Sequence, residues 1–512
     1  MARLSLAIRK IIRFSLALSL AITTIVLSET DIVSQSAKDI VLGHYLRDVD
    51  SLKRRAALFL FDNMEGHSYI TFDLSDTAGK VIPFDVLNFQ SCEELEASFK
   101  TLESAHGVLD FKIRDVCSDD SAISASFVID HVDKAFEAWQ TRPWAKTFTF
   151  EQFCEYILPY RGSNEPLEKW RGHFSTRYDS AFHGMKDTID PIEAACIINQ
   201  DLMSWFRFDP RFYYHPTDQG LSEMLQNKIG RCEDMTNLTI YAMRANGLAV
   251  TSDYTPYWAN SGNNHAWNAI VTTGGEVIPF MGAEANPRAY RLPNKLAKVY
   301  RKTFSLQRRN LAFQVNHPDD APKYLSSKCY IDVTSDYTSV SDVRVRISVP
   351  DSIRHAYICV FNSGEWKAIH WGEVRSDSVT FYEMGVDVAY LPGLYVNGEI
   401  KPVGSAFLLT KAGDIRPAVA DTTKLIDMVL HSTTMKTLEV STDGILKAAF
   451  EVGTEYVLCY WSDGWVCVGK RIADGGPLLF PNVPSNGLYW LTAANSNKEE
   501  RIFTYSDGQV WW

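Results

Sequence analysis

The hydrophobic pattern of this chain changes its period along the sequence, and this change constrains the fold more than any single motif. From about residue 30 to 200, apolar residues recur at three- and four-residue steps, as in Ser126 to Thr141, which is typical of amphipathic helices. From about 200 to 300, alternating strand patterns replace the helical ones. Beyond residue 329, short runs rich in Val, Ile, Tyr and Phe lie between turn residues, which indicates antiparallel sandwiches. We therefore predict an α+β protein.

Length and linkers divide the chain further. At 512 residues it exceeds an ordinary domain of about 150 residues, so several units are expected. A polar stretch, NHPDDA, indicates a boundary from residue 316 onward. We expect a mainly helical N-terminal region at 29–199, a mixed core at 200–315, and β-sandwich domains at 316–415 and 416–512.

The two strand-rich units contain a loose internal repeat. Tyr357 to Phe361, followed by Trp366, recurs as Tyr456 to Tyr460, followed by Trp465, about 100 residues later. We therefore expect two tandem β-domains of similar topology. Tryptophans crowd both units, and we expect them either to fill the cores or to stack on the sugar rings of a glycan.

The N-terminus predicts export. Basic residues precede an uncharged apolar run from Phe14 to Ser28, which is short for a spanning helix and typical of a secretory signal. We assign 1–28 to this signal and expect a periplasmic, cell-surface or extracellular protein. The alternative is an uncleaved anchor, which would hold the protein at a membrane.

Composition excludes several classes of partner. Hydrophobic residues make up 46% of the chain and charged residues 22%, a globular profile. The net charge of −11 removes the basic field that nucleic acid binding needs. Nine cysteines are too few for a disulfide scaffold. We find no metal-ligand spacing and no phosphate-binding glycine loop, so we expect no metal and no cofactor.

One cysteine lies at a position in the sequence that favours a reactive thiolate. The segment from Cys232 to Ala245 has helical periodicity, and Asn246-Gly247 is a helix stop. Cys232 therefore opens a helix, where the positive end of the helix dipole favours the thiolate. The acidic neighbours Glu233 and Asp234 oppose ionisation. Most cysteines are structural, and the reactive reading of Cys232 depends on a nearby base.

The candidate base is His265, at the start of an apolar strand ending at Val271. If Gly274-Gly275 form a two-residue hairpin turn, paired residue numbers sum to 549 and His265 lies opposite Glu284. Opposed side chains share one face of a sheet, so Glu284 could orient the imidazole. A four-residue turn would instead bring Gly282 opposite.

These residues carry a resemblance. Gly230-x-Cys232-x-Asp234, Arg244-Ala-x-Gly247 and His265-Ala-Trp267 resemble the core of the transglutaminase-like superfamily. The upstream segments starting at Cys154 and Asn164 are similar to the N-terminal extensions of exported bacterial members that carry β-domains. The resemblance implies a papain-like fold with a Cys, His and Asp triad.

The third member of that triad departs from the family pattern. Met281 stands where the family usually has Asp, so the role passes to Glu284. A side-chain oxyanion donor is not fixed by the pattern, and Tyr213 and Tyr214 are the candidates.

We predict an exported cysteine enzyme with catalytic residues Cys232, His265 and Glu284. It would act on a protein or peptide-like substrate through a thioester, with hydrolysis favoured over acyl transfer to an amine. The alternative is an inactive transglutaminase-like scaffold that binds a surface glycan or protein, and Met281 at the acid position favours it.

Overall fold

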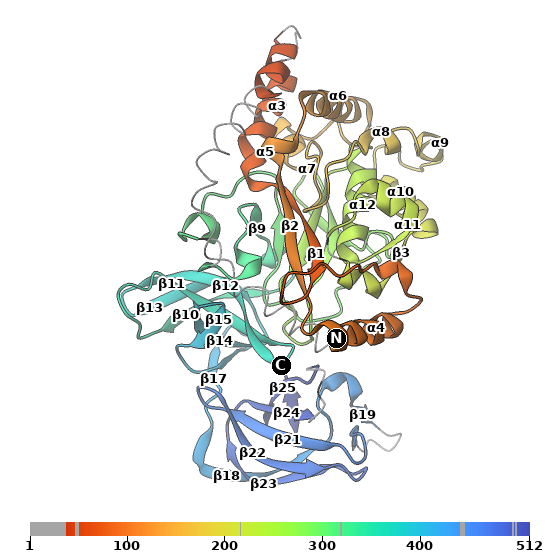
Figure 1. Ribbon diagram of the computed structural model, residues 1–512. Helices are drawn as coiled ribbons and strands as arrows, with labels where there is room; N and C mark the ends of the chain where they lie inside the picture. The colour runs from red at the N-terminus through yellow and green to blue at the C-terminus, as the bar shows by residue number, and fades with distance from the viewer. Residues whose placement is uncertain are drawn as a thin grey trace.

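The computed structural model describes residues 37–46, 51–215, 217–317, 320–440, 446–493, 496 and 499–512. The predicted signal at 1–28 lies outside them. Figure 1 shows helices and a mixed core at one end of the molecule and two strand-rich units at the other. Among the helices of the described residues, none combines the length and the apolar character needed to cross a bilayer. The molecule is α+β, as the sequence predicts.

The N-terminal region is mainly helical, and its caps explain where the helices begin. Helix α6, Ala125–Thr141, starts after Ser124, whose side chain accepts a hydrogen bond from the Phe127 amide. Helix α7, Phe150–Tyr156, starts with a capping box between Thr149 and Gln152. With α3, Ser51–Asn63, these helices enclose one buried apolar cluster.

This region also contains a feature that the helical periodicity did not predict. Strands β1, Ser68–Ser75, and β2, Asp110–Ser118, pair antiparallel, and helix α4, Cys92–His106, lies in the connection between them. Only Leu74 and Ser75 of these strands are buried. The short alternation in SYITFDLS is the sequence signal for β1, although it is easily missed among helices.

The core holds a five-stranded sheet in the order β7-β6-β5-β8-β9. The strands are β5, Val250–Thr255, β6, His265–Val271, β7, Val277–Phe280, β8, Tyr300–Lys302, and β9, Tyr330–Asp332. Helix α12, Cys232–Arg244, packs on β5 and β6. Its other neighbours include α8, Arg171–Phe174, α10, Pro191–Trp205, and α11, Leu221–Asn227.

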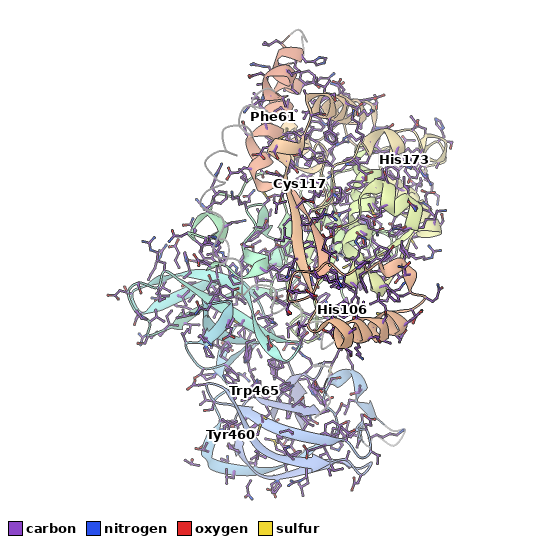
Figure 2. The ribbon with its side chains drawn as sticks, viewed as in Figure 1. Phe61, His106, Cys117, His173, Tyr460 and Trp465 are labelled. Atoms are coloured by element: carbon purple, nitrogen blue, oxygen red, sulfur yellow. The ribbon has the colours of Figure 1, made fainter. Side chains whose placement is uncertain are left out.

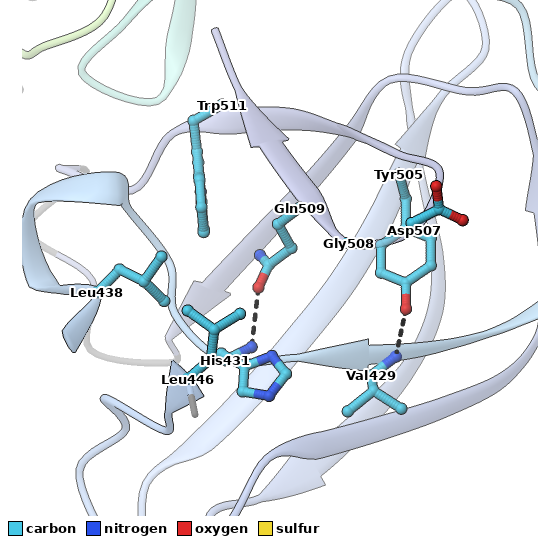
Figure 3. A pocket seen from close by; sticks show the side chains of 9 residues that line it. All are labelled: Val429, His431, Leu438, Leu446, Tyr505, Asp507, Gly508, Gln509 and Trp511. Carbon is cyan, nitrogen blue, oxygen red and sulfur yellow. Dashed lines mark hydrogen bonds between the residues drawn. The ribbon is translucent and has the colours of Figure 1, made fainter. Parts of the chain in front are cut away.

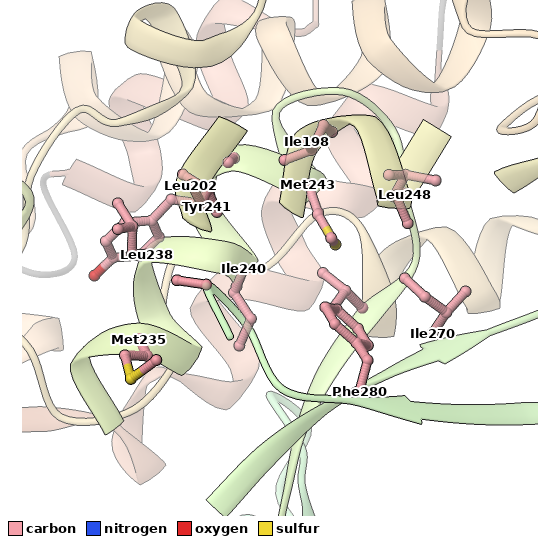
Figure 4. Packing of buried hydrophobic residues seen from close by; sticks show 14 of the residues in the cluster. Ile198, Leu202, Met235, Leu238, Ile240, Tyr241, Met243, Leu248, Ile270 and Phe280 are labelled. Carbon is pink, nitrogen blue, oxygen red and sulfur yellow. The ribbon is translucent and has the colours of Figure 1, made fainter. Parts of the chain in front are cut away.

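Helix α12 is almost wholly buried. Met235, Leu238 and Met243 lie in one apolar cluster with Ile198 of α10 and Ile270 of β6 (Figure 4). Of the helix residues, only Glu233 keeps more than slight exposure. A helix buried on all sides cannot shift without opening cavities, so its first residue is held in place.

The two C-terminal units repeat one strand order. The first contains β10, Val340–Arg346, β11, His355–Asn362, β12, Glu365–Arg375, β13, Ser378–Gly385, β14, Val388–Val396, β15, Glu399–Pro402, β16, Phe407–Leu409, and β17, Ile415–Pro417. The second contains β18, Asp421–Leu430, β21, Glu455–Trp461, β22, Trp465–Ile472, β23, Leu478–Ser485, β24, Tyr489–Ala493, β25, Ile502–Tyr505, and β26, Gln509–Trp511. The path β12-β11-β14-β16-β17 corresponds to β22-β21-β24-β25-β26, and the pair β10-β13 to β18-β23. The sequence repeat therefore has a structural counterpart.

The tryptophans of these units pack against each other where the units meet. Trp366 of β12 lies 5.5 Å from Trp461 of β21, centroid to centroid, and Phe361 of β11 lies 5.5 Å from Trp465 of β22. Trp465 is labelled in Figure 2, near the boundary between the two units. These rings, with Trp490, join a cluster that also contains Tyr254 and Tyr300 of the core sheet. They form an internal junction between the units.

A buried ion pair supports the far side of the core sheet. Arg301 of β8 donates three hydrogen bonds to Asp253 of β5, at 2.7, 2.9 and 3.3 Å, and both residues are buried. Tyr337 donates to the same carboxylate at 2.6 Å and accepts a hydrogen bond from the Trp267 indole. Trp267 of the His-x-Trp motif is therefore fixed by this network.

Removing the Arg301 cation tests this network. Arg301→Met should lower the free energy of unfolding by about 3 to 5 kcal/mol, because Asp253 stays buried without its counter-ion. Urea titration followed by tryptophan fluorescence measures the loss. Arg375→Met is the control, since its ion pair with Glu373 is exposed and should contribute less than about 1 kcal/mol. Equal effects of the two substitutions would contradict a structural role for the buried pair.

Candidate functional site

The start of α12 is built around Asp234. Its carboxylate accepts hydrogen bonds from the backbone amides of Arg231 and Gln219, both at 2.9 Å. Burial raises the pKa of Asp234 to about 6, against the opposing charge of Arg231. A Cβ on Gly230 would lie 2.7 Å from the Asp234 Cβ, so only glycine fits there. The Gly-x-Cys-x-Asp pattern is therefore the set of residues that holds Cys232 at the helix start.

The Cys232 sulfur is buried and surrounded by polar groups. The residue is 5% exposed, and its thiol donates a hydrogen bond to the Glu233 carboxylate, with the sulfur 3.0 Å from Oε2. Burial, followed by the charge of Glu233, raises the pKa of Cys232 well above its usual value. The backbone amide of Ala266 acts in the opposite direction and lowers the pKa of Cys232. In this arrangement the thiol is protonated at neutral pH.

His265 lies at the first position of β6, directly before Ala266. Its ring stacks on Trp258, with centroids 5.7 Å apart and planes inclined by 25°, and lies 5.9 Å from the Trp267 ring. Burial lowers the pKa of His265, while the Glu233 charge raises it. Glu233 links the two predicted catalytic residues indirectly, since its carboxylate accepts the thiol of Cys232 and its charge acts on His265. The imidazole itself has another partner.

That partner is Tyr290, and the expected pairing with Glu284 is wrong. The β6-β7 register pairs Asn268 with Phe280 and Val271 with Val277, so paired numbers sum to 548. The turn contains one residue more than predicted, with Gly275 at φ +84° and its amide donating to the Thr272 carbonyl.

This change in the β6-β7 register means that Glu284 is not opposite the His265 imidazole. After Phe280 the chain curls through a turn in which the Ala285 amide donates to Met281, and Glu284 is exposed. His265 Nε2 is instead 2.8 Å from the Tyr290 hydroxyl. Burial, then the charges of Glu284 and Cys232, raise the pKa of Tyr290. Sequence reasoning missed Tyr290, because a tyrosine in an irregular loop carries no motif.

Two further tyrosines border the site. Tyr213 contacts Cys232, and its pKa is raised by burial and by the Cys232 and Glu233 charges. Tyr214, the other candidate oxyanion donor, bonds Glu96 at 3.4 Å instead. Tyr324 is half-buried as a residue, accepts a hydrogen bond from Asn264 at 2.8 Å, and its pKa is raised by desolvation of the side chain. Tyrosine hydroxyls that stay protonated can donate hydrogen bonds to a developing negative charge.

Comparison with known proteins finds a similarity in one segment of the chain. Residues 182–280 match the family model described as the transglutaminase-like superfamily. The chain contains a transglutaminase-like core. Cys232 and His265 lie inside the matched segment, and Glu284 lies outside it. No curated protein matches the chain.

Among solved structures, the red sea bream transglutaminase is similar to this chain at 8% sequence identity. The match covers 91% of this chain and 78% of that one, with a TM-score of 0.20.

The β-units hold the loop that supports His265 in the transglutaminase-like core. The loop from Trp258 to Asn263 directs its carbonyls at Asn362 of β11, whose amide donates to Trp258, Ser261 and Asn263 at 2.8 to 3.1 Å. Arg501 of the last unit donates to the carbonyls of Ala259 and Ser261 and also to Phe361. Arg501 is buried, which lowers its pKa to about 9. Both β-units therefore fix the ring on which the imidazole stacks.

A cavity of about 200 Å³ lies in the last β-unit, away from the transglutaminase-like core (Figure 3). Tyr505 and Gln509 accept hydrogen bonds there from the amides of Val429 and His431. The lining residues are Val429, His431, Leu438, Leu446, Tyr505, Asp507, Gly508, Gln509 and Trp511. In the described part of the chain, no group of three or more His, Cys, Asp or Glu side chains is arranged to hold a metal ion.

Glu233→Gln tests the cause of the raised thiol pKa. The amide keeps a hydrogen-bond acceptor and removes the charge, so the pKa of Cys232 should fall. A fall of one unit in the pKa gives about ten times more thiolate. Because a thiolate of lower pKa is also a weaker nucleophile, the net rate of alkylation should rise about threefold. Iodoacetamide labelling of Cys232, followed by peptide mass spectrometry between pH 6 and 9, measures the rate, which should rise with pH in both proteins. Glu276→Gln, in the exposed hairpin turn, should leave the rate unchanged. An unaltered rate in Glu233→Gln would mean that burial alone sets the pKa.

Arg501→Met tests the support of the His265 loop. The carbonyls of Ala259, Ser261, Phe361 and Trp512 lose a donor, so the free energy of unfolding should fall by at least about 2 kcal/mol. Hydrogen exchange should rise at residues 258–265 of the full chain. Arg471→Met, which alters an exposed arginine of the same unit, should leave exchange in that loop unchanged. Exchange that rises in the last unit alone would contradict the link to the core.

Proposed function

We propose that this chain is an exported cysteine enzyme of transglutaminase-like type that acts on a peptide-like amide through a thioester on Cys232. The observation that carries the proposal is that α12, which begins at Cys232, packs on β6, which begins at His265 and whose Ala266 amide favours the thiolate. A nucleophile, a base and backbone donors at one point are the parts that acyl transfer requires.

The reaction starts with proton transfer from the Cys232 thiol to the His265 imidazole. The sulfur attacks the substrate carbonyl, and the Ala266 amide and the Tyr213 hydroxyl stabilise the oxyanion. The imidazolium then protonates the departing amine, which leaves the acyl group on sulfur. Water or a second amine, deprotonated by the neutral imidazole, attacks the thioester and releases Cys232. Tyr290 acts as a positioning residue for the ring, the role first expected of Glu284.

The described arrangement corresponds to a resting state in this scheme. Glu233 Oε2 accepts the hydrogen bond of the thiol with the sulfur 3.0 Å away, and the same oxygen lies 3.7 Å from Nε of the Arg231 guanidinium. Rotation of Glu233 from the sulfur toward Arg231 would release the thiol and remove the nearest negative charge from it. Substrate entry would also have to displace side chains, because the sulfur is buried.

The second candidate function is a scaffold that binds a glycan or protein without chemistry. The raised pKa of Cys232, caused by burial and Glu233, favours it, because a protonated buried thiol is a poor nucleophile. Trp511 and polar side chains line the cavity of the last unit, which is the place where a sugar ring would bind. The tryptophans of the junction are occupied with each other and are not available for that role.

An activity assay separates the two functions. The full mature chain is incubated with casein, with and without a fluorescent primary amine, and ammonia release, peptide cleavage and amine incorporation are measured. An enzyme gives at least one product, Cys232→Ala gives none, and His265→Ala reduces the rate by about 10² to 10⁴-fold. Cys92→Ala removes a half-exposed thiol of α4 and should keep full activity.

Iodoacetamide labelling makes the negative outcome decisive. If casein yields no product and Cys232 reacts no faster than Cys154, a buried thiol whose pKa burial raises to about 12, the enzyme proposal fails. Binding of labelled oligosaccharides that Trp511→Ala abolishes would then support the scaffold.

A further inference from the structure

Two cysteines face each other across a hairpin of the last β-unit. Cys459 of β21 is the register partner of Cys467 of β22, and their sulfur atoms are 2.6 Å apart. That separation is well inside van der Waals contact, and a disulfide bond measures about 2.05 Å. Opposed residues in an antiparallel pair have Cα atoms about 4.5 to 5.5 Å apart, which lies within the range that a disulfide spans.

The first β-unit provides an internal comparison. A register shift occurs between Leu458 and Cys459 in β21 and at the equivalent place, between Ile358 and Cys359, in β11. Cys359 faces Ala368, so the first hairpin has one thiol where the second has two. The backbone geometry is thus shared, and only the second hairpin carries the chemistry.

We propose that Cys459 and Cys467 form a cross-strand disulfide that closes the β21-β22 hairpin. The exposed Cys467 thiolate attacks a small-molecule disulfide such as oxidised glutathione, which forms a mixed disulfide and releases one glutathione thiolate. The Cys459 thiolate then attacks the Cys467 sulfur and expels the second glutathione. Two protein thiols are oxidised, one glutathione disulfide is reduced, and both protons pass to the released thiolates.

The different exposure of Cys459 and Cys467 determines which of the two thiols reacts first. Cys467 is exposed and Cys459 is buried, so oxidant reaches Cys467 first. Burial, followed by contact with Cys467, raises the pKa of Cys459 to about 12. The attack of Cys459 on the mixed disulfide therefore becomes faster as the pH rises. Only a small fraction of Cys459 is thiolate, but its sulfur is already next to that of Cys467, which raises the rate of attack.

The bond would act on the junction between the β-units. The hairpin ends at Trp461 and Trp465, which face each other in the same register and pack on Trp366 and Phe361 of the first unit. A cross-link two residues away removes conformations of the open hairpin from the unfolded chain. Oxidation should therefore stabilise the junction.

Peptide mapping of the full chain tests the proposal. Trypsin cuts after Lys447 and Lys470, so both cysteines lie in one peptide. The chain is equilibrated with excess oxidised glutathione and then denatured in N-ethylmaleimide, which labels free thiols. This peptide should carry no N-ethylmaleimide and should be lighter by two hydrogen atoms than the unlabelled peptide with two thiols. Reduction with dithiothreitol should restore both labels. Cys459→Ser should leave Cys467 in a mixed disulfide with glutathione.

A stability measurement gives the second readout. The oxidised chain should unfold at a Tm higher by roughly 4 °C than the reduced chain, as reported by tryptophan fluorescence. The double variant Cys459→Ser/Cys467→Ser should show no response to dithiothreitol. Two labels on the oxidised peptide, a disulfide to a third cysteine, or an equal response in the double variant would each overturn the proposal. Activity of Cys232 plays no part in either readout.

Discussion

The Asp234 carboxylate is the contact on which the position of the candidate site depends. By accepting the amides of Arg231 and Gln219, it joins the first turn of α12 to the segment before it. Gly230 allows the close approach that this requires. The role proposed for Cys232 depends on the residue at which α12 begins. Moving the residue by one position along the helix would rotate its side chain by about 100° around the helix axis.

Two opposing influences act on the sulfur once it is in place. The helix start and the Ala266 amide favour the thiolate, while burial and the adjacent Glu233 favour the thiol. In the described arrangement the second pair dominates. The same carboxylate lowers the cost of charging His265, so Glu233 influences both partners in opposite ways. Glu233 is therefore the residue whose position determines the chemical state of the site.

Periodicity predicted two helices well: the segment from Ser126 to Thr141 is α6, Ala125–Thr141, and α12 begins at Cys232 as expected. The hairpin register failed by one residue, because Gly274-Gly275 fits both a two-residue turn and a longer loop with Gly275 at positive φ. That single residue separated Glu284 from His265. Tyr290, Asn362 and Arg501 were beyond sequence reasoning, because their roles arise from tertiary contacts and no local pattern marks them.

The loop beneath His265 has a consequence for how the chain matures during synthesis. Its carbonyls find their last donor in Arg501, close to the C-terminal end of the chain, which lies where the last unit meets the rest of the molecule in Figure 1. Domains emerge from the ribosome and fold in order from the N-terminus. The histidine loop of the transglutaminase-like core therefore stays incomplete until Arg501, in the last β-unit, has been translated.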